Sequence, residues 1–229
     1  MNKLLFVDNV HKKFIESSFD VHVLKGVTLS IQSGEMVALM GVSGSGKSTL
    51  LQLIGGLDVP TSGQILFQGQ ALNVDESSIS MHRQQHVGFV FQKPHLLAEL
   101  TVLENIMLPL LVSGASKTTA AHEAELILHE LGLSDRRDYD VTRLSGGEQQ
   151  RVAIGRSLVR SPLLLLADEP TGNLDTNTAQ SVFGLFLKLC RKRKQAMLMV
   201  THNESLAQQM DRQLSLEDGM IIEKRSHAC

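Results

Sequence analysis

A glycine-rich segment between an apolar run and a helical pattern constrains this chain more than any other feature. Residues 41–48 read GVSGSGKS and fit the pattern G-x-x-x-x-G-K-[ST], with an apolar run at 35–40 before them and a helical pattern at 46–57. Glycines let the backbone curl so that successive N–H groups converge on phosphate oxygens, and the following helix adds the positive end of its dipole. The strand–loop–helix context predicts a site for nucleotide phosphates.

The positions of this loop have separate predicted roles toward ATP and Mg²⁺. Lys47 is expected to reach the β- and γ-phosphates, and the Ser48 hydroxyl is expected to bind Mg²⁺. The other loop residues expected to contact the nucleotide are Gly41, Ser43, Gly44, Ser45, Gly46 and Thr49.

Two adjacent carboxylates follow the apolar stretch LLLLA at 163–167. Ligands of open α/β sheets bind at the carboxyl ends of the strands, which is where Asp168 and Glu169 would lie. We expect Asp168 to hold Mg²⁺ and Glu169 to act as general base toward an attacking water. A carboxylate pair after a strand is a solvated loop or a helix cap about as often as it is a functional pair. The phosphate loop in the same chain favours the catalytic interpretation.

A third motif, LSGGEQQR at 144–151, precedes a helical pattern. Ser145 followed by two glycines is typical of a helix N-terminus with exposed N–H groups, which makes a second anion site. Taken alone it is an ordinary helix cap. One chain cannot readily apply two such sites to the same γ-phosphate, so the pair predicts a head-to-tail dimer. Each Ser145 would then close over the nucleotide held by the other copy.

Composition limits the class of protein. The 229 residues carry 22 Lys and Arg against 24 Asp and Glu, a net charge of −2 that argues against a nucleic-acid-binding protein. Neither Cys190 nor Cys229 has the spacing of a disulfide scaffold or a metal site. The most membrane-like stretch, 106–112, is short and interrupted by Pro109, far below the run of about 18 residues that a spanning helix needs. We therefore expect any membrane contact to be indirect, through partner proteins.

The order of patterns along the chain predicts the fold class. Strand patterns at 4–10, 21–31 and 64–68 precede a helical stretch at about 99–138, after which strands and helices alternate. Alternation of this kind favours a doubly wound α/β core. We expect one composite domain over residues 1–229 with a helical insertion at approximately 93–160.

With these motifs in this order, the chain resembles the nucleotide-binding subunits of ABC transporters over essentially its whole length. The resemblance implies a P-loop NTPase ABC cassette: a RecA-like parallel-sheet core, an antiparallel β subdomain and an inserted α-helical subdomain. It also implies that Gln92 contacts Mg²⁺ and water, and that His202 contacts the γ-phosphate. Further residues that the resemblance places at the nucleotide or the dimer interface are Phe14, against adenine, and Ser145, Gly147 and Asp175.

Three stretches resemble one group of these subunits, the LolD/MacB-type ATPases: GGLDVPTSG at 55–63, HLLAELTVLENIMLPLL at 95–111 and ADEPTGNLD at 167–175. That resemblance implies hydrolysis of ATP to ADP and phosphate, coupled to release of lipoproteins from the bacterial inner membrane toward the outer membrane. It implies a peripheral position on the cytoplasmic face, beneath permease subunits similar to LolC and LolE.

Alternatives remain at this point. Within the same group, the ATPase of a MacB-type system for peptide or drug efflux is possible on the same motifs. In another class, a non-transport ABC ATPase acts on DNA or the ribosome, although such proteins usually carry two cassettes, coiled coils or zinc modules. A module that binds ATP without hydrolysing it is disfavoured by Asp168, Glu169 and His202.

Overall fold

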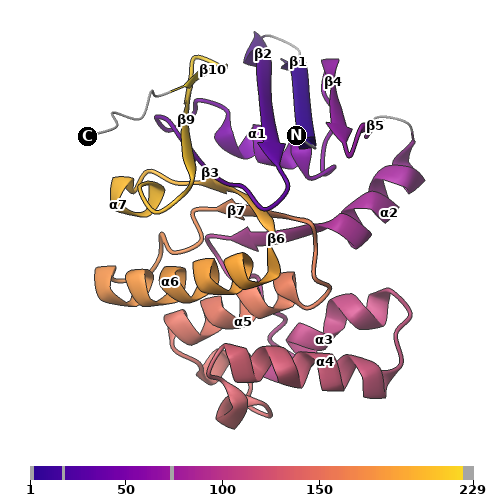
Figure 1. The fold of residues 1–229 in the computed structure, drawn as a ribbon, viewed down its shortest axis with the longest axis vertical. Helices are drawn as coiled ribbons and strands as arrows, with labels where there is room; N and C mark the ends of the chain where they lie inside the picture. Colours follow the sequence, from indigo (N-terminus) through magenta and orange to yellow (C-terminus); the bar gives the residue numbers. More distant parts are fainter. Residues whose placement is uncertain (1–2, 17–18, 73–74, 224–229) are drawn as a thin grey trace. The chain divides into compact units, whose positions relative to one another are not determined.

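The computed structural model describes residues 3–16, 19–72 and 75–223 (Figure 1). The chain divides into two compact units. Unit 1 consists of Met1–Arg83 and Ala196–Cys229, and unit 2 is the continuous segment Gln84–Gln195. Each unit is described by itself below. The expected helical insertion at 93–160 remains a prediction about domain organisation.

Unit 1 contains an antiparallel sheet with strand order β2-β1-β4-β5. Its strands are β1 (Lys3–Glu16), β2 (Phe19–Gln32), β4 (Ser62–Phe67) and β5 (Gln70–Ala71). In β1, Leu5, Val7 and Val10 are fully buried, and the pairing with β2 shifts register between Val7 and Val10. The strands run longer than the sequence predicted, because pairing continues past the apolar residues to Glu16 and Phe19.

Unit 1 also contains parallel strands around β3 (Met36–Met40), which is the strand that leads into the phosphate loop. On one side β3 pairs with β8 (Ala196–Val200) and on the other with β9 (Arg212–Glu217), both in parallel, and β10 (Met220–Glu223) is antiparallel to β9. Every residue of β3 and β8 is buried. Continuous apolar runs of this kind are typical of parallel strands covered on both faces. Helices α1 (Lys47–Ile54) and α7 (Glu204–Ala207) belong to this unit, and α2 (Glu76–His86) begins in it.

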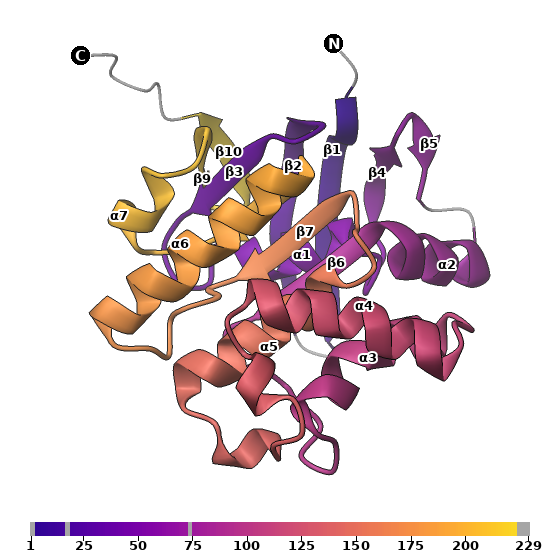
Figure 2. The ribbon, with the colours of Figure 1, turned by 60° about the horizontal axis from the view of Figure 1, so that its bottom comes forward.

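Unit 2 pairs β6 (Val87–Phe91) in parallel with β7 (Leu164–Asp168) and is otherwise helical. Its helices are α3 (Val102–Val112), α4 (Lys117–Glu130), α5 (Gly146–Leu158) and α6 (Thr176–Arg193), with the 3₁₀ turns η1 (Ser134–Arg136) and η2 (Val141–Arg143). Figure 2 shows α3, α4 and α5 side by side. They pack closely at Gly155, where a Cβ would lie 2.6 Å from Leu131 and 2.9 Å from Ile127.

Pro109 lies inside a helix, in the stretch 99–138 that the sequence predicts to be helical. Helix α3 continues through Pro109 to Val112. A proline inside a helix costs about 3 kcal/mol or more because it removes one hydrogen bond and crowds the preceding turn. Here a capping box between Thr101 and Glu104 holds the helix N-terminus, and the buried side chains on α3 offset the remaining cost.

Helix α2 is absent from the sequence-based prediction. Its sequence, ESSISMHRQQH, has few apolar residues, so it shows no clear helical periodicity. The N-terminal signal is Asp75, whose carboxylate accepts hydrogen bonds from the Ser78 N–H at 2.8 Å and from the hydroxyls of Ser77 and Ser78. These bonds, led by the one from Ser77, lower the pKa of Asp75 to about 2.

Asn105 organises the loop that precedes α3, and its replacement provides a test of stability. Its buried Nδ2 donates to the carbonyl oxygens of Leu97, Leu100 and Thr101, and its Oδ1 accepts from the Leu97 N–H at 2.9 Å. Asn105→Ala leaves these groups without that partner, so the free energy of unfolding should fall by about 2–4 kcal/mol. Urea denaturation measures the change, with the exposed Gln84→Ala as control. Equal stability of Asn105→Ala and the parent would contradict the prediction.

Candidate functional site

The phosphate loop connects the end of β3 to the start of α1 in unit 1. Gly41 has φ of +148°, and a Cβ there would lie 2.3 Å from the carbonyl oxygen of Leu216. Gly46 caps α1 in the left-handed region with φ of +101°, and a Cβ there would lie 2.8 Å from Leu24. Both positions therefore exclude side chains, which keeps the backbone N–H groups of the loop close to any bound phosphate.

Lys47 lies within the curl of this loop. Its side chain is nearly buried, and its Nζ donates to the carbonyl oxygens of Gly41 at 2.9 Å and Val42 at 2.7 Å. The first-turn N–H groups of α1, which have no helical acceptor, are at the same end of the helix. A cation and free N–H groups at one point suit a polyphosphate.

His202 lies at the same sheet edge as this loop. Strand β8 runs parallel to β3 with Leu39 opposite Val200, and the Thr201 N–H donates to the Leu39 carbonyl at 3.2 Å. The carboxyl ends of the two strands thus meet at one edge. His202 follows β8 at that edge and is exposed.

Phe14 is on the antiparallel sheet of unit 1, which contacts the phosphate loop where Leu24 approaches Gly46. Its ring is 41% exposed. The Nζ of Lys12 lies 4.9 Å from the ring centroid and is fixed by a 2.7 Å ion pair with Asp58. An exposed aromatic ring on a strand that packs near the loop can stack on a nucleotide base.

In unit 2, strand register brings the two carboxylates level with Gln92. Phe91 at the end of β6 pairs with Asp168 at the end of β7, so Gln92 and Glu169 follow side by side. Both side chains border Gly172, where a Cβ would lie 2.9 Å from the Gln92 Nε2 and 3.1 Å from the Glu169 Oε2. These positions place a carboxylate and an amide together at the end of a parallel pair.

Glu169 has a left-handed backbone with φ of +46°. For a residue with a side chain this conformation costs about 1–2 kcal/mol. The Gly172 N–H donates to the Glu169 carbonyl at 2.9 Å, which closes a turn around it. Such strain is often found at functional positions, where the surrounding structure fixes the direction of a side chain.

Two residues near Gln92 escaped the sequence-based prediction. Asn173 forms a reciprocal pair with Gln92, in which the Gln92 Nε2 donates to the Asn173 Oδ1 at 3.1 Å and the Asn173 Nδ2 donates to the Gln92 carbonyl at 3.2 Å. Gln150 on α5 is buried and donates to the Phe91 carbonyl at 3.0 Å. Both residues lie inside motifs that the sequence shows. Their partners are far away along the chain, 59 residues for Gln150 and 81 residues for Asn173, so motif spacing does not reveal these contacts.

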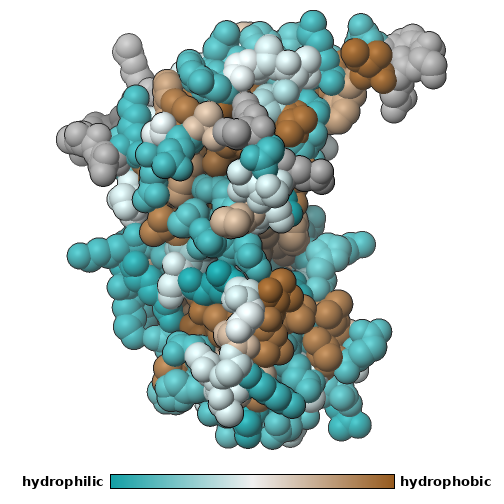
Figure 3. All heavy atoms as spheres, turned by 90° about the vertical axis from the view of Figure 1, so that its right-hand side faces the viewer, coloured by the Kyte–Doolittle hydropathy of each residue, from teal (hydrophilic) through white to brown (hydrophobic). Residues whose placement is uncertain are grey.

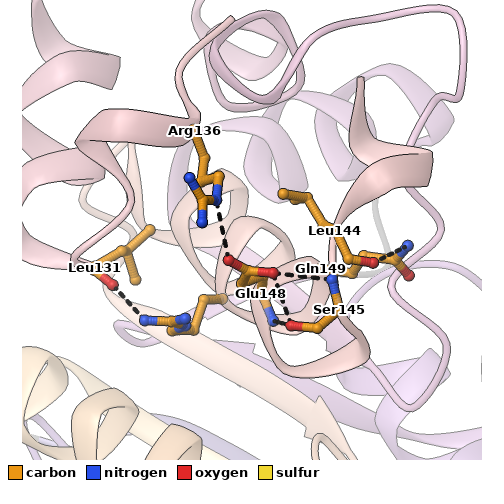
Figure 4. Close-up of polar contacts among 7 residues, drawn as sticks. Leu131, Arg136, Leu144, Ser145, Glu148 and Gln149 are labelled. Atoms are coloured by element: carbon orange, nitrogen blue, oxygen red, sulfur yellow. Dashed lines mark hydrogen bonds and ion pairs between the residues drawn. The ribbon is translucent and has the colours of Figure 1, made fainter. Parts of the chain in front are cut away.

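Ser145 is the N-cap of α5 and forms a capping box with Glu148 (Figure 4). The Ser145 N–H and hydroxyl both donate to the Glu148 Oε2, at 2.9 and 2.7 Å, and the Glu148 N–H donates to the Ser145 Oγ at 3.4 Å. The Nε of Arg136 lies 3.3 Å from the other carboxylate oxygen. These contacts, the bonds from Ser145 first, lower the pKa of Glu148 below its ordinary value.

The same unit brings the N-terminus of α5 against the segment that precedes α6. A Cβ on Gly146 would lie 3.3 Å from Leu174, and one on Gly147 would lie 2.6 Å from Thr178. Asp175 is the N-cap of α6, and its carboxylate accepts from the N–H of Thr178 at 3.1 Å. Hydrogen bonding, that from Thr178 foremost, lowers the pKa of Asp175.

Each unit, taken by itself, carries groups of the kind that ATP phosphates or Mg²⁺ use as partners. Unit 1 provides a cation inside a phosphate-type loop, and its Ser48 hydroxyl lies in the first turn of α1. Unit 2 provides the carboxylate of Asp168 and the amide oxygen of Gln92. Hydroxyl, carboxylate and amide oxygens are the ligands that Mg²⁺ prefers, and Mg²⁺ commonly uses one or two carboxylates beside phosphate oxygens.

Other reactive groups do not form a competing site in the part of the chain that the structure describes. No three His, Cys, Asp or Glu side chains cluster there as a metal site, and no helix there is long and apolar enough to cross a membrane. Burial raises the pKa of the Cys190 thiol to about 12, so it stays protonated at neutral pH. Cys229 lies outside the described residues.

Comparison with known proteins agrees with these motifs. The family described as "ABC transporter" matches residues 24–172. The "Lipoprotein-releasing system ATP-binding protein LolD" of Syntrophus aciditrophicus is 46% identical over 96% of this chain and 99% of its own length. The protein of the same name from Psychrobacter arcticus is 48% identical over 96% of this chain and 98% of its own length.

Solved structures resemble this chain along nearly all of its length. A dimeric bacterial ABC transporter cassette, MJ0796, matches with a TM-score of 0.88 and 36% identity, over 98% of this chain and 100% of that one. A post-hydrolysis state of the same cassette with ADP and Pi matches with a TM-score of 0.87 and 35% identity, over 97% and 99%. The predicted fold class, a cassette with parallel strands and an antiparallel sheet, is confirmed.

Proposed function

The chain belongs to the ABC transporter family, and we propose that it is the ATP-hydrolysing subunit of a transporter that releases lipoproteins from the bacterial inner membrane toward the outer membrane. The observation that carries this proposal is its end-to-end similarity, at 46–48% identity, to lipoprotein-releasing ATP-binding proteins. A chain with the full set of hydrolytic motifs, including Lys47, Glu169 and His202, is suited to power such a system.

Each residue has a proposed role in the hydrolysis of ATP to ADP and phosphate. Lys47 offsets charge on the β- and γ-phosphates, and His202 contacts the γ-phosphate. Glu169 accepts a proton from the water that attacks the γ-phosphorus, and the adjacent Gln92 amide orients that water. Phe14 stacks on the adenine ring, where a neighbouring cation at Lys12 steadies its position.

Magnesium has proposed ligands in the same set of residues. Ser48, Asp168 and Gln92 would hold it, and when bound it supplies positive charge that neutralises the phosphate oxygens. The remaining loop residues bind phosphate mainly through backbone N–H groups: Gly41, Ser43, Gly44, Ser45, Gly46 and Thr49.

The working unit is proposed to be a head-to-tail dimer of this chain. Ser145 and Gly147 at the N-terminus of α5 would bind the γ-phosphate of ATP held by the other copy, and Asp175 would lie at the interface. The dimeric state of the similar cassette MJ0796 supports this arrangement. ATP binding would close the dimer, and hydrolysis with product release would open it.

Unit 2 offers a surface for membrane-embedded partners. Leu97 before α3 and Leu111 and Val112 at its end are large, apolar and exposed. Figure 3 looks onto this side of unit 2, and its lower half shows apolar atoms gathered in one area. We propose that permease subunits similar to LolC and LolE dock here, which places the chain on the cytoplasmic face of the inner membrane as a peripheral subunit. The net charge of −2 fits a protein partner better than nucleic acid.

Reconstitution tests the proposal directly. The chain is co-purified with its membrane partners from its own host and placed in liposomes that carry a triacylated lipoprotein. We expect ATP to release the lipoprotein into the supernatant when a soluble acceptor is present, and the non-hydrolysable analogue to release none. Absence of ATP-dependent release would contradict the cargo assignment.

The same purification separates the alternatives. ATPase stimulation by peptides or drugs, with no lipoprotein release, would favour the efflux system. Co-isolation with ribosomes or DNA in place of membrane proteins would favour the non-transport class.

A further inference from the structure

The N-terminus of α5 carries the negative charge of Glu148. The proposed function requires the same helix end to bind a second negative group, the phosphate of ATP. Glu148 lies in the first turn, and its Oε2 accepts from both the N–H and the hydroxyl of Ser145. The groups with which Ser145 would bind phosphate are thus already engaged by a carboxylate of the same chain. An ionised carboxylate at this point also repels the phosphates of ATP.

Arg136 reaches this carboxylate from outside the helix. Its Nε lies 3.3 Å from the Glu148 Oε1, the oxygen that Ser145 does not use. Figure 4 shows the guanidinium pointing at Glu148 from the segment that carries η1. Glu148 therefore has one oxygen held by the helix cap and the other held by a cation.

A second contact fixes the position of this cation. The guanidinium carbon of Arg136 lies 5.0 Å from the ring centroid of Tyr139, and the Tyr139 N–H donates to the Arg136 carbonyl at 3.0 Å. The aromatic face and the turn limit the directions that the long side chain can take. Arg136 is partly exposed, so its pair with Glu148 contributes little to fold stability.

We propose that Arg136 is a positioning residue, which binds the free carboxylate oxygen of Glu148 and neutralises its charge so that the α5 N-terminus can accept a nucleotide phosphate from a second copy. This inference rests on the proposed role of Ser145 in the dimer. Its effect belongs to nucleotide-driven association more than to folding, because the Arg136 side chain is partly exposed while the phosphate brings several negative charges close to the pair.

The test measures dimer formation as a function of ATP concentration. In the Glu169→Gln background, which is expected to hold ATP without turnover, light scattering follows the association of two copies. Arg136→Met keeps the aliphatic stem against Tyr139 but removes the charge, and should raise the ATP concentration for half-maximal dimer about three- to tenfold. The rise should shrink at high salt. Arg137→Met is the matched control, because Arg137 pairs with Glu125 at 2.8 Å, and it should leave the titration unchanged.

A double variant separates charge compensation from a purely structural role. Arg136→Met combined with Glu148→Gln removes both charges and should restore the titration to within about twofold of the background. Thermal unfolding of each variant checks that the fold is retained. The inference is overturned if Arg136→Met dimerises at the background ATP concentration, or if the double variant remains as impaired as Arg136→Met. Failure of the Glu169→Gln background itself to dimerise with ATP would overturn the proposed function, and this inference with it.

Discussion

Replacing Glu169 by glutamine is expected to lower the rate of ATP turnover by about 10²–10⁴-fold, the range that a general base contributes. The amide has nearly the same shape as the carboxylate but cannot accept the proton of the attacking water. The left-handed backbone at Glu169 and its place beside Gln92 and Gly172 should be retained, since neither depends on the charge. ATP should therefore bind with normal affinity, remain intact and hold two copies together.

Three measurements on one preparation examine this result. Phosphate release gives the turnover rate, equilibrium titration with a fluorescent ATP analogue gives the affinity, and light scattering gives the dimer. Glu123→Gln, on the exposed face of α4, is the matched control and should behave as the parent. Near-normal turnover of Glu169→Gln would exclude Glu169 as the general base, whatever its effect on dimer formation.

The sequence predicted those parts of the fold whose signal is local. Strands β3 and β8 are continuous apolar runs because both faces are covered, and two glycines of the phosphate loop, Gly41 and Gly46, stand where a Cβ would collide with Leu216 or Leu24. In these cases the sequence pattern follows directly from what the fold requires at each position, an apolar side chain or no side chain.

Features that depend on distant partners could not be predicted in this way. The partners of Gln92, at Asn173, and of Glu148, at Arg136, come from segments that only the tertiary fold brings close. Pro109 stands inside α3, in a stretch that the sequence predicts to be helical, because capping and burial outweigh the local cost of a proline there. The roles assigned to the site residues are therefore predictions, and substitution of single side chains tests them.

Replacing Lys47 by alanine is expected to weaken ATP binding by about 10²–10³-fold. Its nearly buried ammonium donates to the carbonyl oxygens of Gly41 and Val42, so it lies within the curl where phosphate oxygens would bind. Removing a hydrogen-bonded charge of this kind costs about 2–5 kcal/mol in binding, and each 1.4 kcal/mol is a tenfold change in affinity. The loss should be in affinity for the triphosphate and not in recognition of adenine.

Comparison of ligands separates these two effects. The affinity of Lys47→Ala for ATP should fall steeply while its weak affinity for adenosine stays unchanged, because Phe14 is intact. Lys188→Ala, an exposed lysine on α6, is the control for loss of one positive charge. Thermal unfolding without nucleotide checks that the loop carbonyls of Gly41 and Val42 tolerate the missing ammonium. Unchanged ATP affinity in a folded Lys47→Ala protein would contradict the role of Lys47 in phosphate binding.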